Sequence, residues 1–96
     1  MAIFVHAVLP GATTDQYDAL NAKLQETPDM FDGCVSHACA PTDDGLEIFD
    51  VWETEQQMNA FGERMMPIAA AEGFPVTEAA PRVLRVHNYW APGAAG

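Results

Sequence analysis

The stretch GLEIFDVWETEQQMNAFGERMMPIAAAEG, from Gly45 to Gly73, decides the fold because a strand passes directly into a helix within it. Along residues 46–53 large apolar side chains fall on both faces of the extended chain, since strand side chains alternate. A strand that is apolar on both sides is usually covered on both sides, so we expect it in the middle of its sheet. Thr54 then caps a helix, and Gln57 is placed to complete a capping box.

The helix that follows Thr54 carries a single apolar stripe, formed by Met58, Phe61, Met65 and Ala69. We expect this stripe to pack on the sheet. Gly73 suits the left-handed conformation that ends many helices, and Pro75 prevents continuation. Gly62 in mid-helix costs up to about 1 kcal/mol relative to alanine, which predicts tight packing there or room for a ligand.

The rest of the chain completes a β-α-β-β-α-β order. Further strands are expected at 2–9, 34–40 and 82–90, and a further amphipathic helix between a cap at Thr13 or Thr14 and Pro28. A short hairpin at 41–45 joins the two middle strands, which are therefore antiparallel neighbours. This is the ferredoxin-like α+β fold, with an antiparallel sheet in the order 4-1-3-2 and both helices on one face. Residues 1–96 are expected to form one domain.

The composition excludes several partners. Four basic and fourteen acidic residues give a net charge of −10, which repels phosphate backbones and anionic lipids, so we expect neither nucleic acid nor a membrane as a partner. A chain of 96 residues buries a modest share of its surface, and a sheet with two apolar faces gains by dimerising. A homodimer is therefore expected. The N-terminus MAIFVHAVLP lacks the features of a signal peptide, which predicts a cytoplasmic protein.

The two cysteines are not expected to form a disulfide. Cys34 and Cys39 are five positions apart in a predicted strand, which places them on opposite faces and about 16 Å apart. A metal site built on this pair would need both sulfurs on one side.

Four stretches of the chain resemble a known superfamily. They are VHAVLPGATTDQYDAL, SHACAPTDDGLEIFDVWET, RMMPIAAAEG and VHNYW, and they resemble small actinobacterial barrel proteins with no settled activity. More broadly, the order of elements, the DVWET turn and the size resemble the dimeric α/β barrel superfamily over residues 2–91. That superfamily contains the antibiotic-biosynthesis monooxygenases and stress-responsive barrel proteins.

The resemblance implies an architecture and a kind of ligand site. Members pack the open faces of two sheets into a barrel and keep a small-molecule pocket between each sheet and its own helices. The haem-degrading branch carries its iron ligand as a histidine on the second helix, and no histidine lies between Thr54 and Gly73. Haem degradation is therefore disfavoured, and no cofactor is expected.

The candidate catalytic residues are polar side chains inside apolar strands, one on each strand: His6, His37, Asp50 and His87. In the order 4-1-3-2 they form a row across the sheet. If the hairpin centres between Asp43 and Asp44, Asp50 lies directly opposite His37, whereas a shift of one residue separates their faces. A carboxylate orients an imidazole and stabilises its protonated form, which makes a general base. The alternative is that each histidine is a structural residue bonded to backbone or water.

Other residues are candidates for substrate contact or for the core. Trp52, Tyr17, Phe61 and Met65 are placed to wall a pocket between sheet and helices or simply to fill it, and Tyr89 to reach the pocket or the dimer seam. Three histidines and an acid are also a set that holds divalent metals, but no close histidine pair supports a metal site, and none is predicted.

Two functions remain open at this point. One is a cofactor-independent monooxygenase or cyclase, which binds an aromatic or polyketide-like molecule and removes a proton with one of the three histidines. The other is a non-catalytic barrel that binds a small molecule or serves in stress or assembly.

Overall fold

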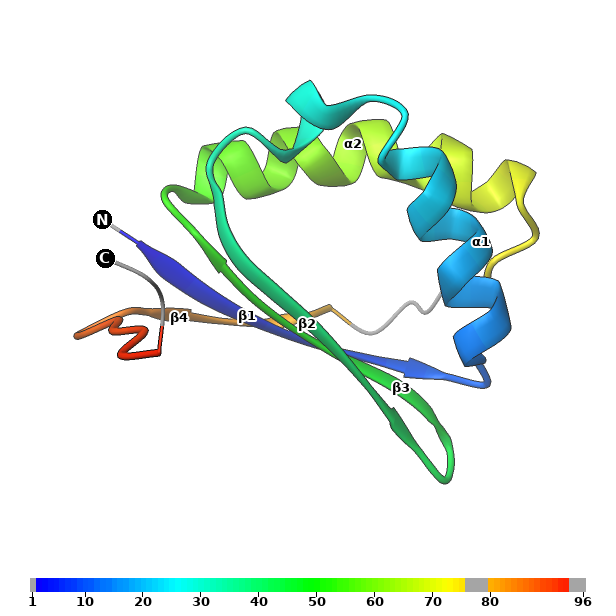
Figure 1. Cartoon of the computed structure of the whole chain (residues 1–96), viewed down its shortest axis with the longest axis horizontal. Helices are drawn as coiled ribbons and strands as arrows, with labels where there is room; N and C mark the ends of the chain where they lie inside the picture. The colour runs from blue at the N-terminus through cyan, green and yellow to red at the C-terminus, as the bar shows by residue number, and fades with distance from the viewer. Residues whose placement is uncertain (1, 76–79, 94–96) are drawn as a thin grey trace.

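The computed structural model describes residues 2–75 and 80–93. In chain order the elements are β1 (Ile3–Pro10), α1 (Thr14–Leu24), the short 3-10 helix η1 (Pro28–Phe31), β2 (Cys34–Thr42), β3 (Gly45–Trp52), α2 (Glu55–Ala71) and β4 (Arg82–Arg85). The strands form one antiparallel sheet in the order β2-β3-β1-β4, with both helices over one face (Figure 1). The predicted ferredoxin-like α+β fold is confirmed.

The two faces of the sheet differ in what covers them. We call the side toward α1 and α2 the helix face and the other side the open face. The helix face presents Ile3, Val5, Asp50 and Trp52, and the open face presents Phe4, His6, Phe49, Val51 and Leu84. Because α1, α2 and η1 all lie on the helix face, both apolar core clusters are on that side.

Two apolar clusters hold the helices on the sheet. Ile3, Val5 and Trp52 pack with Met58 and Phe61 of α2. A second cluster joins the two helices and η1 through Leu20, Leu24, Met30 and Ala69. Each fully buried side chain of this kind stabilises the fold by about 1.5–3 kcal/mol, before chain entropy is counted. The predicted stripe of α2 therefore does face the sheet.

The register of the β2–β3 hairpin is the one expected from a turn centred on Asp43 and Asp44. Thr42 pairs with Gly45, and His37 pairs with Asp50. An irregularity between Cys34 and Ser36 shifts the register beyond this point.

This bulge overturns the prediction that the two cysteines lie on opposite faces. Cys34 pairs with Trp52 and Cys39 with Ile48, and those two partners share a face of β3. Five positions separate the two cysteines, and regular alternation would put them on opposite faces. The extra residue of the bulge shifts the alternation by one, so both cysteines point to the same face. Both cysteines are free thiols.

The helix ends follow the sequence signals closely. The Thr54 hydroxyl accepts a hydrogen bond from the backbone N–H of Gln57 at 3.1 Å, so the predicted cap is confirmed. The side chain of Gln57 accepts from the Thr54 hydroxyl at 3.0 Å, in place of the backbone bond that a complete capping box has. Beyond the other end of α2, Gly73 has a φ of 71°, as expected of a left-handed cap. The expectation of tight packing at Gly62 is wrong, because a Cβ added there would meet no atom within 4 Å.

The last strand is shorter than predicted. β4 ends at Arg85, and the backbone N–H of Val86 donates to the carbonyl of Ala2 at 3.0 Å. β1 begins at Ile3, so the chain beyond Val86 has passed the end of its partner strand. His87 therefore lies after β4 and is exposed, contrary to the prediction of one histidine on each strand. Among the described residues, no helix is long and apolar enough to span a membrane.

Candidate functional site

His37 lies at the centre of a series of hydrogen bonds on the helix face. Its Nδ1 is 2.6 Å from Oδ1 of Asp50 on β3. Its Nε2 contacts the hydroxyl of Tyr17 on α1. At the far end the indole Nε1–H of Trp52 donates to Oδ2 of Asp50 at 3.3 Å. We call these four residues the helix-face chain.

The proton positions in the helix-face chain follow from the chemistry of its ends. An ionised carboxylate only accepts hydrogen bonds, so Nδ1 of His37 carries a hydrogen toward Asp50. In a neutral imidazole the other nitrogen is then an acceptor, and the Tyr17 hydroxyl donates to it. His37 is thus held in the tautomer of a general base, with the lone pair of Nε2 directed at Tyr17.

The chain runs from the interior to the surface. Asp50 is the buried charged residue of the core, at 9 % exposure, and its two donors offset the cost of burying the carboxylate. The side chain of His37 is 38 % exposed, because β2 is an edge strand. The helix-face chain is therefore in contact with solvent at the β2 edge.

The ionisable groups beside the chain are kept neutral. Burial, followed by the charges of Cys39, Asp50 and Asp18, raises the pKa of Tyr17 to about 12. Burial also raises the pKa of both cysteine thiols. Tyr17 therefore keeps its proton at neutral pH, and neither cysteine is activated as a nucleophile.

His6 belongs to a different pair. Val5 is the partner of Asp50, so the next residue on β1 points to the open face. There Nε2 of His6 is 2.7 Å from Oε1 of Glu47, and the ring stacks on Phe49 with centroids 4.8 Å apart. The predicted row of three histidines around Asp50 is therefore wrong: of the three, only His37 contacts this carboxylate.

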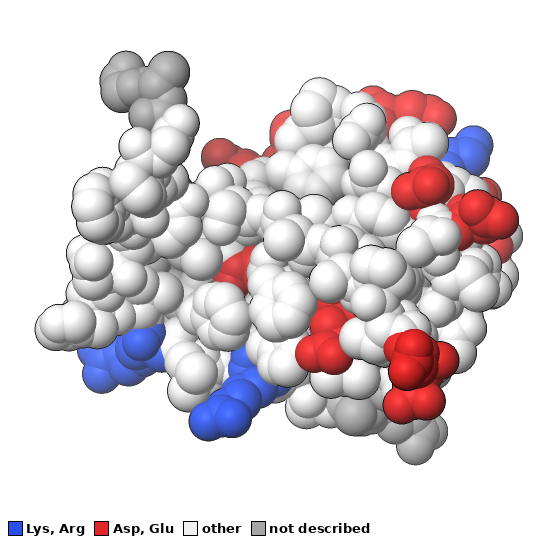
Figure 2. All heavy atoms as spheres, turned by 60° about the horizontal axis from the view of Figure 1, so that its bottom comes forward, with Lys and Arg blue, Asp and Glu red and all other residues white. Residues whose placement is uncertain are grey.

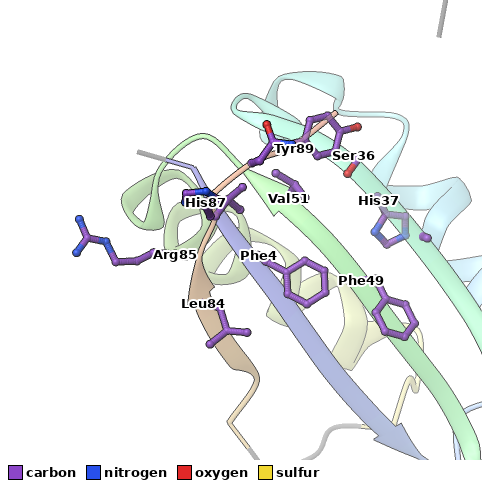
Figure 3. A pocket seen from close by; sticks show the side chains of 12 residues that line it. Phe4, Ser36, His37, Phe49, Val51, Leu84, Arg85, His87 and Tyr89 are labelled. Atoms are coloured by element: carbon purple, nitrogen blue, oxygen red, sulfur yellow. The ribbon is translucent and has the colours of Figure 1, made fainter. Parts of the chain in front are cut away.

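His87 and Tyr89 line a groove on the open face. The groove encloses about 610 Å³, with Phe4, Phe49 and Leu84 among its apolar lining residues (Figure 3). His37 also borders it, but the ring nitrogens of His37 bond Tyr17 and Asp50 on the other side of the sheet. Figure 2 shows this side of the molecule with a largely uncharged middle, acidic residues gathered toward one end and basic residues along the lower edge toward the other.

The remaining predicted contact residues divide between the chain and the core. Tyr17 and Trp52 take part through their polar atoms, which sequence reasoning had not assigned. Phe61 packs against Trp52 with ring centroids 5.2 Å apart, and Met65 packs against the cluster between the helices. Within residues 2–75 and 80–93, no group of three histidine, cysteine or acidic residues is arranged to hold a metal ion.

Several solved structures share this fold. A putative antibiotic biosynthesis monooxygenase from Chloroflexus aurantiacus is 20 % identical, with a TM-score of 0.61, over 96 % of this chain and 97 % of that one. A Streptomyces coelicolor monooxygenase from the gene ActVA-Orf6, in complex with nanaomycin D, is 18 % identical, with a TM-score of 0.58, over 96 % and 92 % of the two chains. The structural-genomics protein YJCS is 14 % identical, with a TM-score of 0.62, over 91 % and 100 %.

This chain is thus similar in fold to antibiotic-biosynthesis monooxygenases. At such identities the similarity concerns the fold alone. No protein-family model matches the sequence, and no curated protein matches it.

Proposed function

We propose that this protein is a small-molecule enzyme of the cofactor-independent monooxygenase or cyclase type, with His37 as general base. The observation that carries the proposal is the 2.6 Å hydrogen bond from His37 to the buried carboxylate of Asp50. The carboxylate fixes the tautomer and stabilises the imidazolium that forms when the ring takes a proton. Positioned bases of this kind contribute about 10²–10⁴-fold to a rate.

Proton removal suits the chemistry of an aromatic or polyketide-like substrate. Loss of a proton from a phenol or an acidic carbon leaves an electron-rich anion. Such an anion reacts with dioxygen in a monooxygenase and with an internal carbonyl in a cyclase. The fold shared with a monooxygenase solved with nanaomycin D supports this substrate class.

The proposed enzyme is a homodimer joined through the open face. Large apolar side chains remain exposed there on the single chain, Leu84 at 45 % and Val8 at 49 %. The largely uncharged middle of the surface in Figure 2 is of the kind that a second copy covers.

The alternative is a dimeric barrel that binds a small molecule without chemistry. The Tyr17 hydroxyl on Nε2 of His37 favours it, because a nitrogen that already accepts a hydrogen bond cannot take a proton from carbon directly. The packing of Trp52, 1 % exposed, against Phe61 favours it too, since both fill space beneath α2.

Two probes measure proton removal without the natural substrate. 4-Nitrophenol shows the absorbance of its anion when it loses its O–H proton, and 5-nitrobenzisoxazole opens when a base removes its C–H proton. The proposal expects the parent protein to promote at least one of these reactions. His37→Gln is expected to open 5-nitrobenzisoxazole about 10²-fold or more slowly, and to ionise less of the bound 4-nitrophenol. Asp50→Asn is expected to lose less, because the base remains without its orienting carboxylate.

His6→Gln serves as the comparison, because it removes the histidine of the other histidine–carboxylate pair. This variant is expected to keep the signals of the parent with both probes. If His6→Gln loses the signals and His37→Gln keeps them, the general base is His6 on the open face. A parent protein that matches His37→Gln with both probes supports the non-catalytic barrel.

A further inference from the structure

We propose that Tyr17 is the residue that meets the substrate, and that its hydroxyl relays a proton from a substrate O–H group to Nε2 of His37. The inference rests on the proposed function and narrows its substrate to molecules that lose the proton of an O–H group, that is, phenols and enols.

The direction of every hydrogen bond in the helix-face chain supports a relay. When His37 is neutral and Asp50 is ionised, Asp50 accepts from Nδ1 of His37, and Nε2 accepts from Tyr17. The Tyr17 hydroxyl therefore donates its single proton to His37, and only the lone pairs of its oxygen remain for a molecule from outside. A molecule that arrives at this oxygen must donate a hydrogen bond to it.

Tyr17 and His37 are in direct contact. Their ring planes differ by 7° with centroids 5.9 Å apart, and the hydroxyl contacts Nε2. The proton donor and its acceptor therefore meet without an intervening group.

The proton balance of the relay is simple. The substrate O–H bond breaks as a new O–H bond forms on Tyr17, and the original O–H bond of Tyr17 breaks as an N–H bond forms on Nε2. The substrate becomes an anion, His37 becomes an imidazolium paired with the Asp50 carboxylate, and Tyr17 is unchanged. Because burial and nearby charges raise the pKa of Tyr17 to about 12, the two transfers occur together, without a free tyrosinate.

The relay also sets specificity. A phenol or enol donates a hydrogen bond to the Tyr17 oxygen and enters the chain directly. A C–H acid makes no comparable hydrogen bond, so it reaches Nε2 only where Tyr17 is displaced. The structure thus assigns Tyr17 the discrimination between the two kinds of acid.

Tyr17→Phe with the two probes tests the relay. The variant keeps the ring but removes the oxygen, so the ionisation of bound 4-nitrophenol is expected to fall about tenfold or more. Opening of 5-nitrobenzisoxazole is expected to rise severalfold, because Nε2 of His37 is uncovered. Trp90→Phe, at an exposed residue outside the helix-face chain, is expected to leave both signals as in the parent.

Opposite responses to the two probes distinguish a relay from structural damage, which lowers both. Nitrophenol ionisation that persists in Tyr17→Phe overturns the relay while leaving His37 as the base. A parent protein that opens 5-nitrobenzisoxazole but does not ionise 4-nitrophenol also overturns the relay and leaves His37 as the base. A parent inactive with both overturns the relay and the proposed function together.

If Tyr17→Phe is poorly folded, nitrogen NMR of His37 in the parent decides the question. Protonation of Nε2 when 4-nitrophenol binds supports the relay, and an Nε2 that stays unprotonated overturns it.

Discussion

The phenol of Tyr17 links the candidate site to alkaline stability. Burial is the largest cause that raises the pKa of Tyr17 from 10.0 to about 12, with smaller contributions from negative charge at Cys39, Asp50 and Asp18. Between these two pH values the unfolded chain loses a proton that the folded chain retains. The stabilising effect is therefore complete below pH 10 and is lost as the pH rises toward about 12.

Urea denaturation at several pH values between 9 and 12 checks this effect. The unfolding free energy of the parent is expected to fall more steeply with pH than that of Tyr17→Phe. The cysteines, whose pKa values are also raised by burial, are present in both proteins. Parallel slopes for the two proteins contradict the prediction.

Trp52 is expected to matter through a single polar atom. Trp52→Phe keeps an aromatic ring in the core but leaves Oδ2 of buried Asp50 without its indole donor. A buried acceptor left unsatisfied costs about 1–3 kcal/mol, and the smaller ring adds to the loss. Chemical denaturation measures the change, with Trp90→Phe as control because Trp90 is 76 % exposed. Equal midpoints for the two variants would show that the indole bond is unimportant.

The sequence predicted part of the candidate site. The hairpin residues Asp43 and Asp44 fixed the turn, and counting from it placed Asp50 opposite His37, as observed. The bond from Tyr17 to His37 was not predictable, because it depends on how α1 is docked on the sheet. The strand order alone left open the face that His6 occupies, and the pairing of Val5 with Asp50 places it on the open face.

Replacing either of two glycines by alanine is expected to change the stability of the fold, with opposite signs at the two positions. Gly62→Ala, in α2, meets no atom within 4 Å and is expected to stabilise the protein by about 0.5–1 kcal/mol. Gly45→Ala, at the start of β3, would place a Cβ 2.2 Å from the backbone oxygen of Leu9 and is expected to destabilise it. Thermal or urea unfolding of both variants measures the two signs. Destabilisation by Gly62→Ala would mean that the space beside this helix is occupied in solution.

The elements themselves were largely predictable, and their ends less so. Caps and breakers such as Thr54, Gly73 and Pro10 act within a few residues, so a local sequence pattern reveals them. The length of β4 and the bulge near Ser36 depend on where the partner strand begins and how the chain enters the sheet. Those are properties of pairing between distant segments, which no single segment encodes.

The open face predicts the behaviour of the whole molecule in solution. Light scattering is expected to give twice the mass of the single chain, because apolar residues such as Leu84 are exposed on the single chain and gain by association. Leu84→Glu, which places a charge on this face, is expected to give a monomer. Met66→Glu is the control, since Met66 is as exposed, at 44 %, but lies on α2. A parent that remains monomeric at micromolar concentration contradicts the homodimer.

The two tryptophans give this molecule two separate optical reporters. Trp52 is 1 % exposed and bonded to Asp50, so its emission is expected at short wavelength and protected from acrylamide quenching. Trp90 is 76 % exposed, so its emission is expected at long wavelength and easily quenched. In Trp90→Phe the remaining signal follows events on the helix face alone, while in Trp52→Phe it follows the C-terminal segment. A single fluorimeter can thus distinguish ligand arrival from association of two chains.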